Sequence, residues 1–273
     1  MITFPNAKIN LGLNIVSRRP DGYHNIETVF YPIPLTDSLE IVPAEGSEST
    51  LTCYGRVVDC PTEKNLVMKA YRMMEKEFGL PPVDIYLVKH IPDGAGLGGG
   101  SSDASFCMKM LNDLFELGCT DEQLAKKASK IGADCPFFIH NKPMMATGIG
   151  DEFTPTDVCL KGKHMLLVKP DVSVPTKAAY AQVTPAPSAK PIPEILPDGM
   201  KNWQKDLVND FEKSVFAQYP SLAEIKRTLL ESGASYAAMS GSGSSIFGIF
   251  SCAEMAEKAA DNFKEYSHFV IQL

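Results

Sequence analysis

The sequence lacks the cysteine and histidine patterns of disulfide-bonded and metal-binding proteins. Its seven cysteines are an odd number without a C-x-x-C pair, and its five histidines are scattered without metal-ligand spacing. We therefore expect reduced thiols in the cytoplasm rather than a disulfide framework, and no structural metal. The first residues show no basic stretch followed by an apolar run, so we expect no signal peptide. The charge-free stretch 235–253 is rich in serine and glycine, which excludes it as a membrane span.

Positive charge is also in short supply. The net charge of −7 argues against nucleic acid as an electrostatic partner. The sequence contains neither the G-K-S or G-K-T end of an ATPase P-loop nor the H-R-D and D-F-G motifs of protein kinases. What remains is an ordinary balance of 44% hydrophobic and 22% charged residues over 273 positions, a length that favours two domains.

Glycine, by contrast, is concentrated in one place. Five of the seven residues from Gly94 to Gly100 are glycines, which allow positive φ angles and close backbone approach but provide no side chains for a core. Residues 83–89 alternate like a strand, and the apolar residues of 107–115 share one helical face, with Gly118 where a C-cap is expected. The glycines therefore predict a strand-to-helix turn whose N–H groups form a phosphate cradle.

Two other interpretations of the same glycines remain open. Gly94, Gly96 and Gly99 match the dinucleotide pattern G-x-G-x-x-G of nicotinamide-dependent oxidoreductases. In that class, an acidic residue ends a second strand about twenty positions later. Here, residues 112–117 at that place still predict helix, which counts against that class. A glycine-rich surface turn without a ligand is the second alternative, and the three serines at the start of the helix count against it.

The N-terminal residues predict a strand with one buried and one polar face. Apolar residues at positions 9, 11, 13 and 15 alternate with polar or small ones that include Lys8 and Asn10. A lone lysine in such a strand is most simply a solvated edge residue, although Lys8 shares its face with Asn10 and with no other charge. The following turn, residues 18–24, carries two arginines, Tyr23 and His24, and is either a binding loop or an ordinary one.

Two later stretches contain further candidates. Asp134 is a single carboxylate among small and apolar residues, where a charge is costly unless it is paired, and Pro136 is expected to end any helix. The alternative is a helix-end or turn aspartate that hydrogen-bonds to backbone. Residues 237–250 predict two strands around the turn 240–243, which is either a simple hairpin turn or a second backbone wall facing the glycine loop.

Periodicity and turn residues predict the remaining elements. We expect strands at 26–33, 38–42 and 164–169, a short helix near Tyr180, and longer helices at 66–78, 120–131 and 220–233. The proline-rich stretch 184–197 is expected to be an irregular surface loop, after which a helical pattern resumes at Lys205. We place a domain hinge at 147–151 and the two domains at residues 1–152 and 153–273.

Three separate stretches, residues 5–11, 92–102 and 240–243, follow one another in an order that resembles the galactokinase–homoserine kinase–mevalonate kinase–phosphomevalonate kinase (GHMP) superfamily. Residues 19–24 and 133–138 resemble, more narrowly, the family of 4-diphosphocytidyl-2-C-methyl-D-erythritol kinases of the non-mevalonate isoprenoid pathway. The resemblance covers nearly the whole chain. It implies an α+β fold of two domains, the N-terminal one like ribosomal protein S5 domain 2 and the C-terminal one ferredoxin-like.

The resemblance also implies the reaction and its residues. The enzyme would transfer a phosphoryl group from ATP, bound as MgATP, to the 2-hydroxyl of 4-diphosphocytidyl-2-C-methyl-D-erythritol. In the family, the aspartate matched by Asp134 is the catalytic base, and the lysine matched by Lys8 lies beside it and helps to keep it ionised. The residues that match ATP-binding positions are Asn65, Leu66, Lys89, Pro92, Gly94, Ala95, Gly96, Leu97, Gly98, Gly99, Gly100, Ser101 and Ser102.

The residues that match acceptor-binding positions are Asn10, Tyr23, His24, Thr176 and Tyr180. The two tyrosines are of the right type to sandwich the pyrimidine ring. The partners implied are this small molecule and ATP, with no nucleic acid, no membrane and no metal ligand from the protein. The oligomeric state implied is a monomer or a weak homodimer.

The sequence departs from the family pattern at two acidic residues. Asp103 stands where relatives have asparagine, and Asp93 where methionine is common, so the roles of both stay open. Two other functions stay open as well. A non-catalytic nucleotide-binding relative is disfavoured because both Lys8 and Asp134 are present, and a kinase of another alcohol, such as homoserine or phosphomevalonate, is disfavoured by the turn that carries Tyr23 and His24.

Overall fold

A computed structural model describes residues 1–57, 60–188 and 190–273. The chain has a mixed α+β fold, and it divides into two compact units. The first unit comprises Met1–Ala7, Leu35–Asp93 and Gly98–Lys142, and the second comprises Lys8–Pro34, Gly94–Leu97 and Pro143–Leu273. The units therefore draw on interleaved segments of the chain, and the division at residues 152 and 153 stays a prediction. None of the helices in the described part of the chain is long and apolar enough to cross a membrane.

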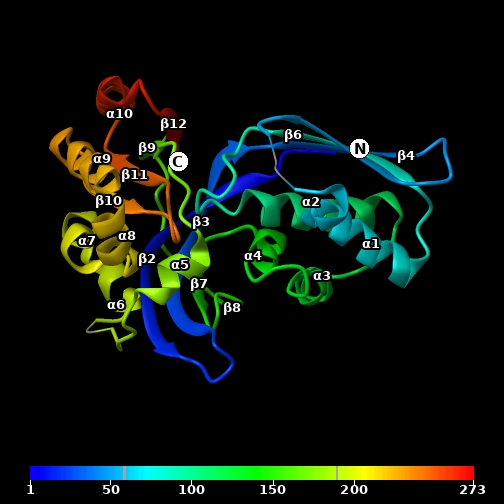
Figure 1. Ribbon diagram of the computed structural model, residues 1–273, viewed down its shortest axis with the longest axis horizontal. Coiled ribbons are helices and arrows are strands. Elements are labelled where there is room, and N and C mark those ends of the chain that lie inside the picture. The colour runs from blue at the N-terminus through cyan, green and yellow to red at the C-terminus, as the bar shows by residue number, and fades with distance from the viewer. Residues whose placement is uncertain (58–59, 189) are drawn as a thin grey trace. The chain divides into compact units, whose positions relative to one another are not determined.

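The first unit is a four-stranded sheet with helices on one face (Figure 1). The strands, in sheet order, are β1 (Ile2–Thr3), β4 (Ser38–Pro43), β6 (Val83–Lys89) and β5 (Thr50–Gly55). Neighbouring strands are antiparallel except β5, which pairs with β6 in parallel. The helices are α1 (Leu66–Phe78), α2 (Gly99–Leu114), α3 (Asp121–Ala128) and α4 (Cys135–His140), with a short 3₁₀ turn, η1 (Thr62–Lys64), before α1.

Local sequence signals explain how these helices begin and end. The side chain of Asn65 accepts a hydrogen bond from the Val67 N–H at the start of α1, and Gly79 ends that helix at a φ of 67°. The predicted capping box of Thr120 and Gln123 opens α3. Helix α2 was expected to continue to Gly118, which is wrong, because α2 ends at Leu114.

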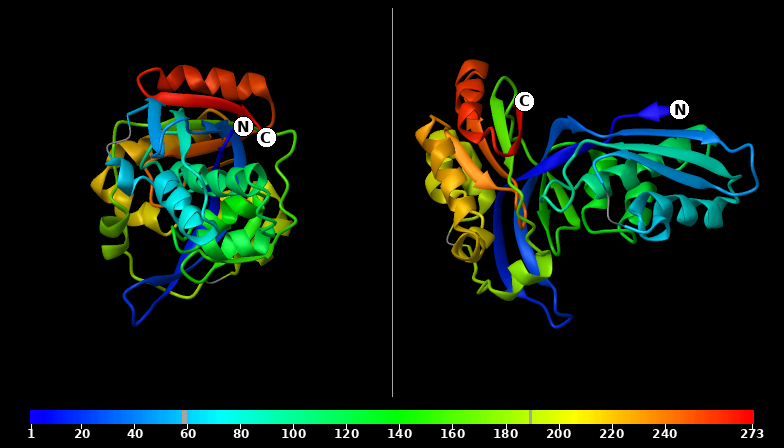
Figure 2. Two further views of the ribbon diagram at one scale, coloured as in Figure 1. Left: turned by 90° about the vertical axis from the view of Figure 1, so that its right-hand side faces the viewer. Right: turned by 45° about the horizontal axis from the view of Figure 1, so that its top comes forward.

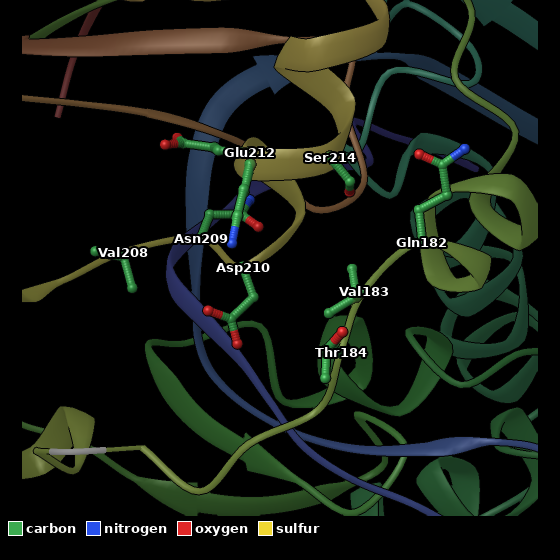
Figure 3. Close-up of a pocket in the computed structure, with 9 residues that line it drawn as sticks. Gln182, Val183, Thr184, Val208, Asn209, Asp210, Glu212 and Ser214 are labelled. Atoms are coloured by element: carbon green, nitrogen blue, oxygen red, sulfur yellow. The ribbon is translucent and has the colours of Figure 1, made fainter.

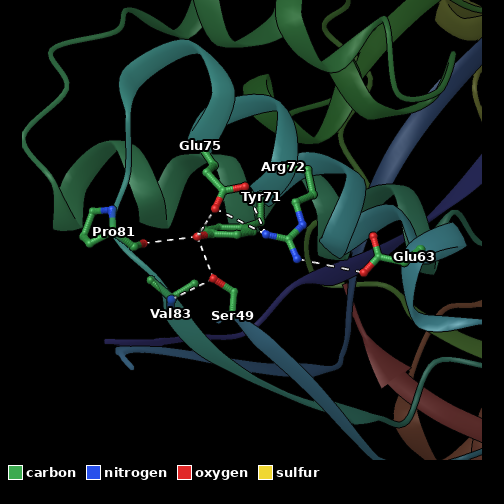
Figure 4. Close-up of polar contacts among 7 residues, drawn as sticks. All are labelled: Ser49, Glu63, Tyr71, Arg72, Glu75, Pro81 and Val83. Carbon is green, nitrogen blue, oxygen red and sulfur yellow. Dashed lines mark hydrogen bonds and ion pairs between the residues drawn. The ribbon is translucent and has the colours of Figure 1, made fainter. Parts of the chain in front are cut away.

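A buried tyrosine fastens α1 to the loops around it (Figure 4). The Tyr71 hydroxyl accepts a hydrogen bond of 2.6 Å from Ser49 and lies 3.0 Å from the carboxylate of Glu75 and 3.1 Å from the carbonyl oxygen of Pro81. Ser49 precedes β5 and Pro81 precedes β6, and the ring itself is fully buried. The hydroxyl therefore joins the helix to two strands of the sheet without leaving a buried polar atom unpaired.

The second unit contains two antiparallel sheets, one of which is covered by α9 and α10 (Figure 2). The first sheet has the order β2 (Asn6–Arg18), β3 (His24–Thr36), β7 (Met144–Thr147) and β8 (Glu152–Pro155). The second has the order β10 (Tyr236–Met239), β11 (Ile246–Phe250), β9 (His164–Lys169) and β12 (Ser267–Gln272). The helices are α5 (Thr176–Ala181), α6 (Ile192–Ile195), α7 (Met200–Asp206), α8 (Phe211–Gln218), α9 (Pro220–Glu231) and α10 (Ala253–Ala260), with short 3₁₀ turns η2 (Leu196–Asp198) and η3 (Asp261–Phe263).

Most predicted elements are confirmed, and four details are corrected. Both faces of β2 are buried from Ala7 to Ile15, so its polar face is not solvated. Pro136 lies in the first turn of α4, where a proline is tolerated, rather than ending a helix. The stretch 184–197 contains α6, although its residue 189 lies outside the described residues, and the helical pattern at Lys205 belongs to two helices, α7 and α8. Residues 148–151 form the turn of the β7–β8 hairpin, within the stretch 147–151 that was predicted to be a domain hinge.

Candidate functional site

In the second unit, Lys8 is a buried lysine on β2. Only 3% of its surface is exposed, so its interpretation as a solvated edge residue is wrong. Its Nζ donates a hydrogen bond of 2.7 Å to Oδ1 of Asn10 and lies 4.6 Å from the centre of the Phe30 ring. Its backbone N–H donates to the carbonyl oxygen of Leu97, at 2.9 Å. The ammonium group therefore sits on a strand whose backbone is hydrogen-bonded to the glycine loop.

A chain of hydrogen bonds orients Asn10 toward this lysine. Its Nδ2 donates to Oγ1 of Thr28, at 3.0 Å, and that hydroxyl in turn donates to the carbonyl oxygen of Gly12, at 2.5 Å. Because Nδ2 is engaged by Thr28, the amide presents its oxygen to Lys8. All three side chains are buried. Thr28 is thus a supporting residue that the sequence did not single out.

The turn at residues 240–243 contacts the glycine loop, as the second of its two interpretations predicted. Oγ of Ser240 donates to the carbonyl oxygen of Gly96, at 2.8 Å, and the Ser245 N–H donates to that of Ala95, at 3.2 Å. Gly96 has a φ of 76°, and a Cβ placed there would lie 2.0 Å from the carbonyl oxygen of Ser240. No residue with a side chain fits this approach, which is why position 96 requires glycine.

Asn209 holds the other side of the same turn. Its Nδ2 donates to the carbonyl oxygens of Met239 and Gly241, each at 2.8 Å, and its Oδ1 accepts from the Phe211 N–H. The side chain is 4% exposed and uses both donors and its acceptor. In the sequence, Asn209 is an ordinary polar residue between two helical patterns, and no local signal distinguishes it.

In the first unit, the glycine loop passes into α2. Gly98, at the N-cap, has a φ of 72°, and the helix begins at Gly99 and buries Ser102 and Asp103. The first N–H groups of a helix have no partner within it and, together with the helix dipole, they favour an anion. The confirmed strand-to-helix turn therefore has the backbone of a phosphate cradle.

Four predicted ATP-binding residues line one pocket of about 160 Å³ in this unit. They are Asn65, Leu66, Lys89 and Gly100, the last of which lies at the start of α2. The remaining lining residues are Cys60, Lys64, Leu87, Asp93 and Asp103. Its apolar wall and its position at the helix start suit the base and sugar of a nucleotide.

Lys89 is held by two buried carboxylates, those of Asp37 and Asp103. Its Nζ forms an ion pair with Asp37 and a second one, of 2.6 Å, with Oδ2 of Asp103. Burial raises the pKa of Asp103 to about 8, Lys89 opposes this shift and Asp37 adds to it. Burial disfavours the charge on Lys89, but Asp103 and Asp37 raise its pKa. Asp37 was not a candidate from the sequence, where it is a single acid between two strands.

Asp134 occupies the N-cap position of α4, but its side chain makes no capping hydrogen bond there. The start of α4 is fixed from α2 instead. Oγ of Ser105 lies 2.7 Å from the carbonyl oxygen of Cys135 and 2.8 Å from that of Ser101. The carboxylate is therefore placed by its neighbours and does not serve as the cap of its own helix.

Two of the predicted acceptor-binding residues of the second unit, His24 and Tyr180, form an aromatic group with Phe211. The ring of His24 stacks on that of Tyr180, with centres 4.9 Å apart and an angle of 15° between the planes. Phe211 meets Tyr180 edge-on, at 4.8 Å. Thr176 and Ser242 have their hydroxyl oxygens 3.1 Å apart. Tyr23 is 61% exposed, and it is His24 that lies against Tyr180, so the tyrosine sandwich stays a prediction.

The larger pocket, of about 510 Å³, lies elsewhere in the second unit, between the end of α5 and the start of α8 (Figure 3). It is lined by Gln182, Val183, Thr184, Val208, Asn209, Asp210, Glu212, Lys213 and Ser214. None of these is a predicted site residue. Oδ2 of Asp210 accepts a hydrogen bond of 2.7 Å from the Ile15 N–H, and burial raises the pKa of this carboxyl. The size of this pocket is therefore not evidence of function, and its residue Asp210 binds the backbone of β2. The described residues contain no group of three histidines, cysteines or acids that could hold a metal ion.

Comparison with known proteins agrees with this geometry. Residues 65–142 match the GHMP kinases N terminal domain and residues 193–268 match the GHMP kinases C terminal family. The chain is 56% identical to the 4-diphosphocytidyl-2-C-methyl-D-erythritol kinase of Bacteroides fragilis, over 94% of this chain and 95% of that one. It is 54% identical to the enzyme of the same name from Parabacteroides distasonis, over 98% and 96%.

A crystal structure of 4-(cytidine 5'-diphospho)-2C-methyl-D-erythritol kinase matches 99% of this chain and 98% of that one, with a TM-score of 0.85 and 31% identity. A homoserine kinase from Cytophaga hutchinsonii shares the fold alone, with a TM-score of 0.69 and 17% identity over 98% and 95% of the two chains. The chain belongs to the 4-diphosphocytidyl-2-C-methyl-D-erythritol kinase family of GHMP kinases.

Proposed function

We propose that this protein transfers the γ-phosphoryl group of ATP to the 2-hydroxyl of 4-diphosphocytidyl-2-C-methyl-D-erythritol, in the non-mevalonate route to isoprenoids. The observation that carries the proposal is the buried Lys8, whose strand is hydrogen-bonded to Leu97 of the glycine loop. A buried ammonium group beside a loop of this kind suits an anion such as a phosphate. The identity of the acceptor is inferred from the family to which the chain belongs.

Each step of the reaction is assigned to a residue of this chain. Asp134 takes the proton of the acceptor hydroxyl as its oxygen forms a bond to the γ-phosphorus, and the bond from that phosphorus to the leaving oxygen of ADP breaks. Lys8 offsets negative charge on the transferred group, and Asn10 fixes the position of its Nζ. Catalysis of phosphoryl transfer depends mainly on positioning and on the stabilisation of charge, and Asp134 and Lys8 are proposed to provide these.

The glycine loop and the pocket next to it are proposed as the ATP site. The N–H groups of the loop and of the first turn of α2 bind the phosphates, and Asn65 and Leu66 contact the adenosine. We propose that Mg²⁺ would enter with ATP as MgATP and would offset the negative charge of the phosphates. Lys89 forms the wall of this site, since its ammonium group is engaged by two carboxylates.

The aromatic group is proposed as the site of the cytidyl end. Tyr180 offers a ring face for stacking, and His24, now against that face, has nitrogen atoms suited to the polar edge of a pyrimidine. Tyr23, exposed in the neighbouring turn, is proposed to cover the base from the other side. Thr176 is proposed to contact the acceptor from the start of α5.

The cellular setting is also a proposal. All seven cysteines are free thiols, which suits a reducing cytoplasm. We further propose that the enzyme works as a monomer or a weak homodimer, without a membrane or a nucleic acid as partner.

A coupled assay for ADP release tests the proposed function. The purified protein is given MgATP with 4-diphosphocytidyl-2-C-methyl-D-erythritol, homoserine, mevalonate or phosphomevalonate in turn. We expect sustained ADP release with the cytidyl alcohol and background rates with the others, and we expect mass spectrometry to find one added phosphate on the product. Turnover with another alcohol alone would assign a cousin kinase, and no turnover while ATP binds would assign a nucleotide-binding protein.

A further inference from the structure

The two ends of the glycine loop are joined by buried charges. Before the loop, Oδ1 of Asp37 accepts hydrogen bonds from the N–H groups of His90, at 2.6 Å, and Ile91, at 2.8 Å. The other carboxylate oxygen of Asp37 pairs with Lys89, which also pairs with Asp103 in the second turn of α2, after the loop. Asp37, Lys89 and Asp103 are 0%, 4% and 2% exposed, so water does not loosen these contacts.

The same two ends are in direct contact. A Cβ on Gly99, the first residue of α2, would lie 3.0 Å from Cγ2 of Ile91 and 3.4 Å from Nζ of Lys89. The first turn of the helix therefore rests on the residues that Asp37 holds. The loop, residues 92–98, therefore connects two segments that contact each other.

We propose that Asp37, Lys89 and Asp103 form a clamp that fixes the two ends of the glycine loop and thereby sets the N–H groups that bind the phosphates of ATP. This inference rests on the proposed function. The three are positioning residues, because they act through the backbone of the loop and the first turn of α2. Anion binding by backbone N–H groups depends on their direction, so a loosened base weakens binding of the phosphates even where the fold survives.

Charge balance makes the clamp sensitive to alkaline pH. One ammonium group faces two carboxylates, and burial raises the pKa of Asp103 to about 8. The other ionisable groups that act on this site are Cys107 on α2 and Cys53 on β5, and Lys64 and Asp93 border the same pocket. Burial raises the pKa of both thiols, so they stay neutral as Asp103 ionises. Above that pKa the clamp carries a net negative charge near the start of α2, which disfavours a triphosphate.

Direct binding of ATP to variants of the full-length protein tests the clamp. In Asp37→Asn, the amide nitrogen faces Lys89 and the ion pair is lost, while an oxygen remains for the loop N–H groups. We expect the dissociation constant for MgATP, measured by calorimetry at pH 7, to rise about tenfold, the equivalent of one charge-assisted hydrogen bond. Glu77→Gln is the matched control, because it makes the same change in the exposed ion pair with Lys127 of the same unit.

Asp103 provides the second readout. Asp103→Leu should weaken ATP at every pH, whereas Asp103→Asn, which keeps an acceptor for Lys89, should flatten the loss of affinity between pH 7 and pH 9. Affinity for the acceptor should not change in any of these variants. The clamp is refuted if Asp37→Asn binds ATP like Glu77→Gln, or if ATP and acceptor weaken together in proportion to the loss of melting temperature. A wild-type protein that binds no ATP would overturn the proposed function together with the clamp.

Discussion

Each unit buries a lysine beside the glycine loop, and the two lysines contact different kinds of group. Lys89 is paired with Asp37 and Asp103, while Lys8 contacts the amide oxygen of Asn10 and the ring of Phe30. Both lysines are almost fully buried. Because their contacts differ, we expect the two lysines to have different roles.

The difference follows from what buried charge requires. An ammonium group between two carboxylates has its charge offset within the fold, so Lys89 supports the backbone around it. An amide oxygen and a ring stabilise an ammonium group without adding a negative charge. We therefore expect Lys89 to act through the backbone that it supports, whereas Lys8 is the lysine that we propose to act on a phosphate group.

The largest expected effect tests Asp134, the carboxylate of the first unit that we propose as the catalytic base. Asp134→Asn removes the base but keeps the size of the side chain, so kcat should fall by about 10²–10⁴-fold. The dissociation constant for ATP should stay close to that of the wild type, because the glycine loop is unchanged. The measurement is the steady-state rate of ADP release beside an ATP titration.

The control for Asp134→Asn is Asp121→Asn, since Asp121 is another acid at a helix start of the same unit. It should turn over like the wild type. If Asp134→Asn also remains within threefold of the wild-type rate, Asp134 is not the base, and the charge in this part of the first unit is structural.

The next effect tests the neutral contacts of the second unit. Gly96→Ala places a Cβ 2.0 Å from the carbonyl oxygen of Ser240, whereas Gly94→Ala meets only Oγ of Ser173, at 4.0 Å. Both glycines have positive φ, so each change costs about 1–2 kcal/mol of backbone strain. Overpacking should lower the free energy of unfolding of Gly96→Ala by about 1–3 kcal/mol more. It should also weaken the binding of ATP.

Urea unfolding of Gly96→Ala and Gly94→Ala, with ATP titrations of both, measures that difference. Equal free energies of unfolding would show that the turn at residues 240–243 yields to the added methyl group. The second unit would then hold the loop less firmly than its hydrogen bonds indicate.

The sequence predicted best those features that depend on local signals. The glycine turn, the capping box at Thr120 and the cap of α1 at Gly79 each follow from a few adjacent residues. The end of α2 was missed because the left-handed residue that follows the helix is not a glycine. Glu116 has a φ of 50°, and the N–H groups of Leu117 and Cys119 donate to the carbonyl oxygen and Oδ1 of Asn112.

The buried charges could not be predicted, because their partners are distant in the sequence. Asp37 and Lys89 are separated by 52 positions, and nothing around Asp37 marks it as buried. The burial of the polar face of β2 was not predicted for the same reason. Alternation of apolar and polar residues shows which side chains share a face, but only the tertiary contacts show what covers that face.

A smaller effect tests the proposed acceptor site of the second unit. Tyr180→Ala should weaken the acceptor by about 5- to 150-fold, which corresponds to about 1–3 kcal/mol of stacking. Tyr180→Phe should restore most of it, because the ring stacks and the hydroxyl does not. Affinity for ATP should be unchanged in both variants.

Tyr219→Ala is the matched control for Tyr180→Ala, since both tyrosines pack partly buried against the same core. It should lower the melting temperature without changing the acceptor constant. A Tyr180→Ala variant that melts earlier but keeps its acceptor constant would show that Tyr180 is a core residue.

The last expected effect concerns the dependence of stability on pH, which tests the buried charges of the first unit. Folding moves the pKa of Asp103 from 3.8 to about 8, so between these values the folded chain holds a proton that the unfolded chain has released. By linkage, the free energy of unfolding should fall as the pH rises through this window, and this contribution should level off above pH 8. Asp103→Asn cannot titrate, so its curve should lack this slope. Urea unfolding at pH 5.5, 7 and 8.5 measures both, with Glu77→Gln as the exposed carboxylate control. Parallel curves for wild type and Asp103→Asn would mean that Asp103 is already ionised near pH 5.5 and that Lys89 offsets both carboxylates more strongly than burial opposes them.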